Sequence, residues 1–154
     1  MEDSKIMNGA VAVLRSLFGA WNLFFGIVFF FNFPIPQPMG HGELTPYLNQ
    51  TLIDTGLFPV VKVIEIIVGL LLLANRAVPL ALCVYFPITV VIFIVNMFLE
   101  EFGWLGPFIA VAYAAAHLFL FWVYRAYYLP MLTWRASIAG DRQAGRPPSG
   151  SARC

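Results

Sequence analysis

The sequence is poor in charged residues, which make up 11% of its 154 positions, whereas an ordinary soluble domain has about 25%. So few charges do not cover the surface of a water-soluble protein of this size, which excludes a soluble globule. Hydrophobic residues account for 60% of the chain, the opposite of what a disordered protein contains. Nine basic residues face eight acidic ones, so the balance of charge gives no reason to expect a nucleic acid partner.

Cysteine and histidine are also scarce. Cys83 and Cys154 lie too far apart to form the Cys-x-x-Cys pair of a thiol–disulfide enzyme. His41 and His117 lie in unrelated places, which argues against a metal site or a haem with two axial ligands. The sequence also lacks a glycine-rich phosphate loop, a serine nucleophile elbow and a His-Glu-x-x-His pattern. It therefore contains no motif for a metal or a covalently bound cofactor.

Long hydrophobic runs are what the chain has in abundance. A helix needs roughly 20 mostly apolar residues to cross the core of a bilayer. Four runs meet this condition, at residues 11–33, 57–74, 78–99 and 107–128. They are continuously apolar, so we predict helices rather than the alternating strands of a membrane barrel. The sequence therefore predicts an all-α protein, a transmembrane four-helix bundle embedded in the lipid bilayer.

The positions of the basic residues predict the orientation, because cytoplasmic flanks of membrane helices are rich in Lys and Arg. Residues 34–56 and 100–106 contain neither, whereas both ends of the chain and the turn at Arg76 do. We therefore expect both termini in the cytoplasm and a multi-pass protein of a cell membrane of the bacterial inner-membrane type. Residues 1–130 form the predicted bundle, and residues 131–154 form a flexible, basic cytoplasmic tail.

The first outer loop contains the pattern of a short helix. Thr45 is a suitable cap, Pro46 a suitable first helical residue and Gly56 a suitable stop. The apolar residues between them fall on one side. We expect this helix to lie on the membrane surface and to lead into the second span.

Polar side chains inside the predicted spans are candidates for function, because it is costly to bury them in a bilayer. Lys62 and Glu65 lie three residues apart and share one face of the second span. A rise of about 1.5 Å per residue places side chains from all spans in the outer half of the bilayer. They are Asn22, Lys62, Glu65, Asn96, Tyr113 and His117. Arg15 falls near the inner boundary, where we expect it to reach the cytoplasmic interface.

Two interpretations of this outer cluster remain open. In the first, Lys62 and Glu65 neutralise each other, while Asn22, Asn96 and His117 hydrogen-bond the helices together. In the second, the cluster, Tyr113 included, lines a small polar pocket that opens to the outer side. Such a pocket would bind a quinone or another small amphipathic ligand, with Glu65 as a proton carrier.

The first two spans also carry a family resemblance. In the second span Glu65 is followed by Gly69 and a run of leucines, which resembles the second helix of the DoxX-like family of four-helix membrane proteins. Arg15, Gly19 and Gly26 are similar to that family's first-helix pattern. The resemblance implies a four-span bundle and matches Glu65 and Arg15 to family positions.

The resemblance also bears on function, since one relative is the membrane subunit of a thiosulfate:quinone oxidoreductase and others are linked to redox stress or membrane-protein assembly. We therefore expect a non-catalytic subunit or assembly partner of a membrane complex, with a quinone-linked redox complex as one candidate. Its partners would be other membrane subunits or a second copy of the chain. The alternatives are a ligand-binding protein or oxidoreductase subunit that uses the pocket around Glu65, and a small transporter.

Overall fold

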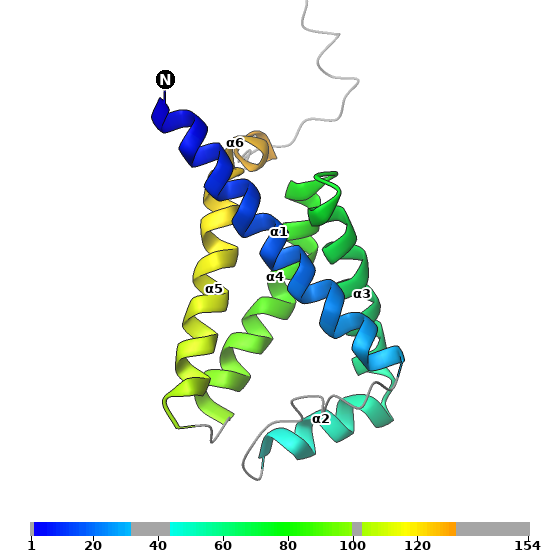
Figure 1. The fold of residues 1–154 in the computed structure, drawn as a ribbon. Coiled ribbons are helices and arrows are strands. Elements are labelled where there is room, and N and C mark those ends of the chain that lie inside the picture. The colour runs from blue at the N-terminus through cyan, green and yellow to red at the C-terminus, as the bar shows by residue number, and fades with distance from the viewer. Residues whose placement is uncertain (1, 32–43, 100–102, 132–154) are drawn as a thin grey trace, which may run out of the picture.

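The computed structural model describes residues 2–31, 44–99 and 103–131, and this part of the chain is all-α (Figure 1). Helices account for 91% of these residues, and none of them lies in a strand. The elements are α1 (Glu2–Phe30), α2 (Leu44–Asp54), α3 (Leu57–Leu73), α4 (Val78–Ile94), the π-helix η1 (Val95–Leu99), α5 (Leu105–Val123), α6 (Arg125–Tyr128) and the 3-10 turn η2 (Leu129–Met131). Apart from Met131, the predicted tail 131–154 lies outside the described residues.

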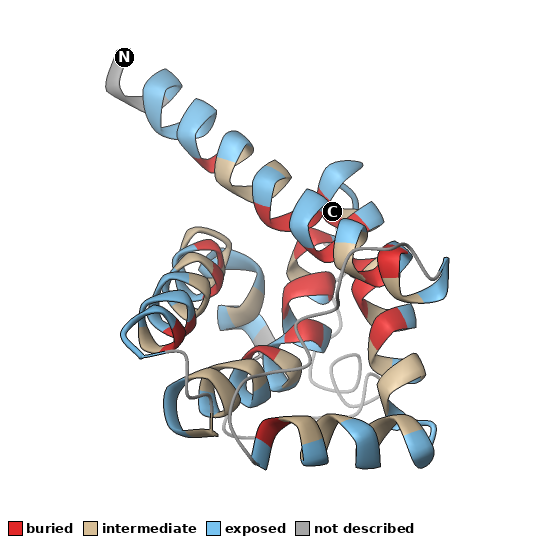
Figure 2. Cartoon of the chain, turned by 60° about the horizontal axis from the view of Figure 1, so that its bottom comes forward, coloured by how far each residue is buried: buried red, intermediate tan, exposed pale blue. Residues whose placement is uncertain are grey.

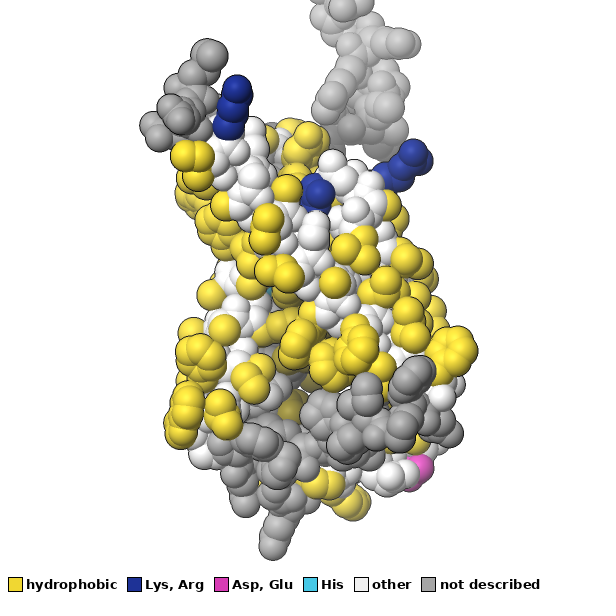
Figure 3. Space-filling view, viewed as in Figure 1, with side chains coloured by type: hydrophobic (Ala, Val, Ile, Leu, Met, Phe, Trp, Pro, Cys, Tyr) yellow, Lys and Arg dark blue, Asp and Glu magenta, His cyan; other side chains and the backbone are white. Residues whose placement is uncertain are grey.

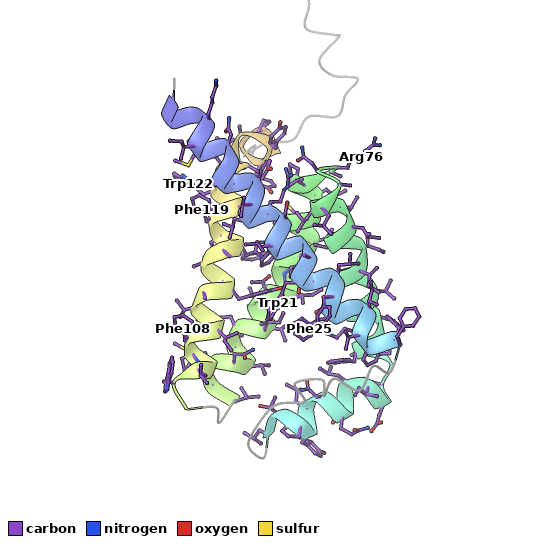
Figure 4. The ribbon with its side chains drawn as sticks, in the orientation of Figure 1. Trp21, Phe25, Arg76, Phe108, Phe119 and Trp122 are labelled. Carbon is purple, nitrogen blue, oxygen red and sulfur yellow. The ribbon has the colours of Figure 1, made fainter. Side chains whose placement is uncertain are left out.

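Three segments are long and apolar enough to cross a membrane: Lys5–Phe30, Val78–Leu99 and Leu105–Val123. The 17-residue α3 meets α2 at a bend of 88°, and this bent pair counts as a fourth span when it is taken as one. Large apolar side chains cover the outside of these helices (Figure 3). Phe108, Phe119 and Trp122, for example, project from the outer side of α5 (Figure 4). The protein is thus built as a membrane protein with three or four spanning helices.

Two helix boundaries differ from the predicted spans. α1 begins at Glu2 rather than at residue 11, and its first turns are exposed and project beyond the other helices (Figure 2). Apolar content marks where a helix can be buried, whereas polar helix-forming residues extend it further. The last span ends as a helix at Val123, because Tyr124 leaves the helical conformation and the chain turns into α6.

Glycines allow α1 and α3 to pack closely. A Cβ atom on Gly69 would lie 2.8 Å from the carbonyl oxygen of Gly19 and 2.8 Å from the backbone nitrogen of Leu23. A Cβ atom on Gly26 would lie 3.1 Å from the carbonyl oxygen of Lys62. Gly19, Gly26 and Gly69 therefore allow the backbones of α1 and α3 to approach each other closely.

The short helix predicted in the first outer loop is present as α2, but Thr45 does not act as its cap. Thr45 is buried inside α2, and its hydroxyl donates to the carbonyl oxygen of Leu99 at 2.9 Å. Leu99 ends η1, and the last carbonyls of a helix have no partner within it. Thr45 therefore ties α2 to the end of the α4–η1 segment. Gly56 does stop the helix, with a φ of 76° that favours glycine.

The core lies between α1, α3, α4 and α5, where the buried residues face one another (Figure 2). Leu72, Leu82, Tyr85 and Leu120 have no exposed surface. Polar residues share this interior, and their bonds define the candidate site.

Candidate functional site

Lys62 and Glu65 form an ion pair on the inner face of α3. Nζ of Lys62 lies 2.9 Å from Oε2 of Glu65, and their side chains are 10% and 7% exposed. Nζ also lies 5.1 Å from the centre of the Phe58 ring, within reach of a cation–π interaction. The three-residue spacing that the sequence displays thus places both charges together, turned toward the other helices.

A chain of hydrogen bonds runs from this pair through three further helices. The hydroxyl of Tyr85 lies 3.5 Å from Oε1 of Glu65 and 2.9 Å from the hydroxyl of Tyr113. The Tyr113 hydroxyl donates to Oδ1 of Asn22 at 2.8 Å, and Nδ2 of Asn22 donates to the carbonyl oxygen of Phe18 at 2.7 Å. The chain therefore connects α3, α4, α5 and α1 in that order, and we call it the Glu65 network.

The direction of these bonds follows from the last acceptor. The Phe18 carbonyl only accepts, so the amide nitrogen of Asn22 faces it and the amide oxygen faces Tyr113. Tyr113 gives its single hydroxyl hydrogen to Asn22 and accepts one from Tyr85. The 2.9 Å contact with Tyr113 is a better hydrogen bond for Tyr85 than the 3.5 Å contact with Glu65. Tyr85 therefore gives its hydrogen to Tyr113, and Glu65 is held mainly by the ion pair between its Oε2 atom and Lys62.

His117 lies beside the Glu65 network but bonds to other groups. Its Nε2 atom faces the carbonyl oxygen of Leu82 at 3.2 Å and therefore carries a hydrogen. Its Nδ1 atom lies 2.5 Å from Oγ1 of Thr89. The imidazole stacks on the ring of Tyr85, with 6.0 Å between the ring centres. Packing rather than a hydrogen bond connects His117 to the network.

Asn96, also predicted in the outer cluster, does not join these residues. It lies in η1 and donates from Nδ2 to the carbonyl oxygen of Ile92 at 2.8 Å, a bond within its own helical segment. The buried polar residues that this span contributes beside the other site residues are Tyr85 and Thr89 of α4, rather than Asn96. Their four-residue spacing on one helical face was the available signal.

Arg15 lies at the end of the bundle that holds the N-terminus, away from the Glu65 network. Its Nη1 atom donates to Oδ1 of Asn75, and to the hydroxyl of Tyr124 at 3.4 Å. Its Nε atom is buried and has no hydrogen-bond partner among the described residues. The side chain is therefore held by the turn between α3 and α4 and by the residue that follows α5, and its position near the interface stays a prediction.

Two hollows open on the outside of the helices, and Glu65 lines neither of them. The first has a volume of about 450 Å³ and lies along α1, with Ala12, Ser16, Ala20 and Leu73 in its walls. The second has a volume of about 220 Å³ and lies between α4 and α5. Its walls include Phe86, Thr89, Phe93, His117 and Leu118.

The described residues hold no group of three or more His, Cys, Asp or Glu side chains suited to a metal ion. Comparisons of the chain with protein-family models, with curated proteins and with solved structures find no match. The resemblance to the DoxX-like family therefore stays a prediction.

Proposed function

We propose that the protein is a four-span bundle with both termini in the cytoplasm, and that it serves as a non-catalytic subunit or assembly partner of a membrane complex. The distribution of charge supports this orientation. Lys5, Arg15, Arg76 and Arg125 belong to elements at the end of the bundle that holds the N-terminus, whereas Asp54 lies at the opposite end with α2 (Figures 1 and 3). Positive residues mark the cytoplasmic side of membrane proteins.

The observation that carries the proposed role is the Glu65 network, whose bonds lie between helices of this chain. Lys62 and Glu65 pair with each other, and the hydroxyls of Tyr85 and Tyr113 bond along a line that ends at Asn22. Polar groups that are satisfied inside the chain hold helices together and need no substrate to complete them. The surface that remains for contacts with other molecules is the large apolar exterior of the helices.

A second stripe of small residues supports contact with another membrane protein. Ala12, Ser16 and Ala20 repeat every fourth residue on α1 and line the hollow of about 450 Å³. Unlike the glycines that face α3, this stripe is left on the outside. Small residues let two helices approach closely in a membrane, and we assign the hollow to a transmembrane helix of a partner subunit.

The test is purification of the full chain from its native membrane in a mild detergent. We expect a second subunit at fixed stoichiometry, and we expect Ala20→Leu to lose it because the new side chain fills the hollow. Ala115→Leu, on the exposed side of α5, is the matched control and keeps the partner. A chain that purifies alone as a monomer contradicts the assembly role. Equal losses in both variants contradict the assigned contact.

The hollow between α4 and α5 favours a second candidate, the binding of a quinone or lipid-like molecule. Thr89 and His117 lie in its walls with Phe86 and Phe93, which suits a ring or chain that enters from the membrane. We expect a short-chain quinone to raise the melting temperature of the protein, and His117→Gln to abolish the rise. Glu65→Gln leaves the rise in place, because Glu65 does not line this hollow. An unchanged melting temperature with the quinone contradicts this candidate.

A further inference from the structure

Three side chains from separate elements meet at the end of the bundle that holds the N-terminus. Arg15 of α1 donates to Asn75, in the turn between α3 and α4, and to Tyr124, which follows α5. Both acceptors are neutral. Among the side chains that the structure describes, the one ion pair is Lys62–Glu65, so no described carboxylate balances Arg15. Within the described part of the chain, the cluster therefore carries the charge of Arg15 without a paired carboxylate.

Hydrogen bonding leaves this cluster rich in donors. The Asn75 oxygen and the Tyr124 oxygen already accept from Nη1 of Arg15. Asn75 retains its amide hydrogens, Tyr124 its hydroxyl hydrogen and Arg15 the rest of its guanidinium hydrogens. A positive cluster that offers donors complements an anion with several acceptor oxygens.

Two further arginines adjoin the cluster. Arg76 directly follows Asn75, and Arg125 directly follows Tyr124; both are exposed. Arg76 extends away from the bundle at this end (Figure 4). The Arg125 guanidinium lies 4.7 Å from the centre of the Trp122 ring, and Trp is enriched at the interface between membrane and water. The three arginines thus lie at the same end of the bundle.

We propose that Arg15, Asn75 and Tyr124 bind the phosphate of an anionic lipid headgroup. The planar guanidinium of Arg15 matches the geometry of phosphate oxygens, and the amide and hydroxyl hydrogens add further donors. A lipid is the source that fits best, because α1 and α5 present exposed apolar side chains on which its acyl chains lie. The site depends on the membrane placement proposed above, but not on a partner subunit or a quinone.

The test measures lipid binding to the full chain in detergent micelles by native mass spectrometry. Phosphatidylglycerol is the anionic probe and phosphatidylcholine the zwitterionic control. We expect the protein to retain phosphatidylglycerol in preference to phosphatidylcholine. We expect Arg15→Gln to weaken the binding of phosphatidylglycerol about tenfold, which corresponds to the loss of one hydrogen bond to a charged group. Lys5→Gln removes a positive charge from the same end of α1 and changes binding about twofold at most, since exposed charges are screened.

Tyr124→Phe provides a second variant, should Arg15→Gln fail to fold. It retains Arg15 and its charge, removes one donor from the site, and weakens phosphatidylglycerol binding severalfold. Equal binding of the two lipids, or equal losses in Arg15→Gln and Lys5→Gln, overturns the site. If inorganic phosphate alone saturates the site and displaces the lipid, the site binds phosphate. That result overturns its assignment to a lipid.

Discussion

The hydroxyl of Tyr113 on α5 donates to the side-chain oxygen of Asn22 on α1, and this bond of 2.8 Å joins helices from opposite ends of the chain. Tyr113→Phe removes the bond but keeps the ring, whose centre lies 4.8 Å from that of Phe18. We expect the free energy of unfolding to fall by about 1 kcal/mol, since Asn22 loses its donor. Denaturant unfolding in detergent measures the loss. Tyr127→Phe, at an exposed position, is the control, and equal effects of the two variants contradict the prediction.

Lys62→Met should be among the most destabilising changes in the protein, because it leaves Glu65 buried without its ion-pair partner. Removal of one partner of a buried pair costs about 3–5 kcal/mol. The double variant Lys62→Met with Glu65→Gln removes both charges, and we expect it to recover much of this loss. Unfolding of Lys62→Met, of Glu65→Gln and of the double variant in one detergent gives the coupling energy. If the loss of stability in the double variant equals the sum of the losses in the two single variants, the coupling energy is zero and the prediction is wrong.

Gly69→Ala tests the close packing of α1 against α3. The new methyl group meets backbone atoms of Gly19 and Leu23 at 2.8 Å, which do not move aside as a flexible side chain would. We expect a loss of about 1–3 kcal/mol in stability, as for an overpacked core. Gly9→Ala is the matched control in α1, because no atom lies within 4 Å of its added Cβ. A helix interior favours alanine, so this control is stabilising, and a stable Gly69→Ala protein contradicts the packing.

Ala77→Gly should stabilise the turn between α3 and α4. Ala77 has a φ of 47°, a left-handed conformation that costs an L-residue roughly 1–2 kcal/mol and that glycine adopts freely. We expect a gain of about 1 kcal/mol in the free energy of unfolding. Ala74→Gly, in the same turn, lowers the free energy of unfolding, because alanine adopts its φ of −70° without strain and glycine adds freedom to the unfolded chain. The melting temperatures of the two variants should therefore move in opposite directions.

Sequence alone predicted the helical class and the extent of the apolar segments, because membrane-crossing length and composition are properties of a single helix. It also placed Lys62 and Glu65 on one face, since helical spacing fixes which neighbours share a side. These predictions need no knowledge of how one helix packs on another.

Contacts between helices were harder to predict. A count of depth from the end of each span put Asn96 in the outer cluster, whereas Tyr85 supplies the hydroxyl from α4. Asn96 lies in the π-helical segment η1 and bonds to Ile92, and the apolar pattern does not predict a π-helical segment. The contact of Thr45 was hard to predict for a similar reason. Its acceptor, the carbonyl oxygen of Leu99, is distant in sequence and is available only because η1 ends there.

The shortness of α3 has a consequence for the surrounding lipid. Its 17 residues, Leu57–Leu73, extend about 25 Å, some 5 Å less than the hydrocarbon thickness of a typical bilayer. The sharp corner at Gly56 prevents α2 from lengthening the rod in the same direction. In the proposed four-span arrangement, the hydrophobic mismatch at α3 is relieved where the bilayer thins beside it. Lipids with shorter acyl chains should therefore gather along α3, giving the protein an asymmetric annulus.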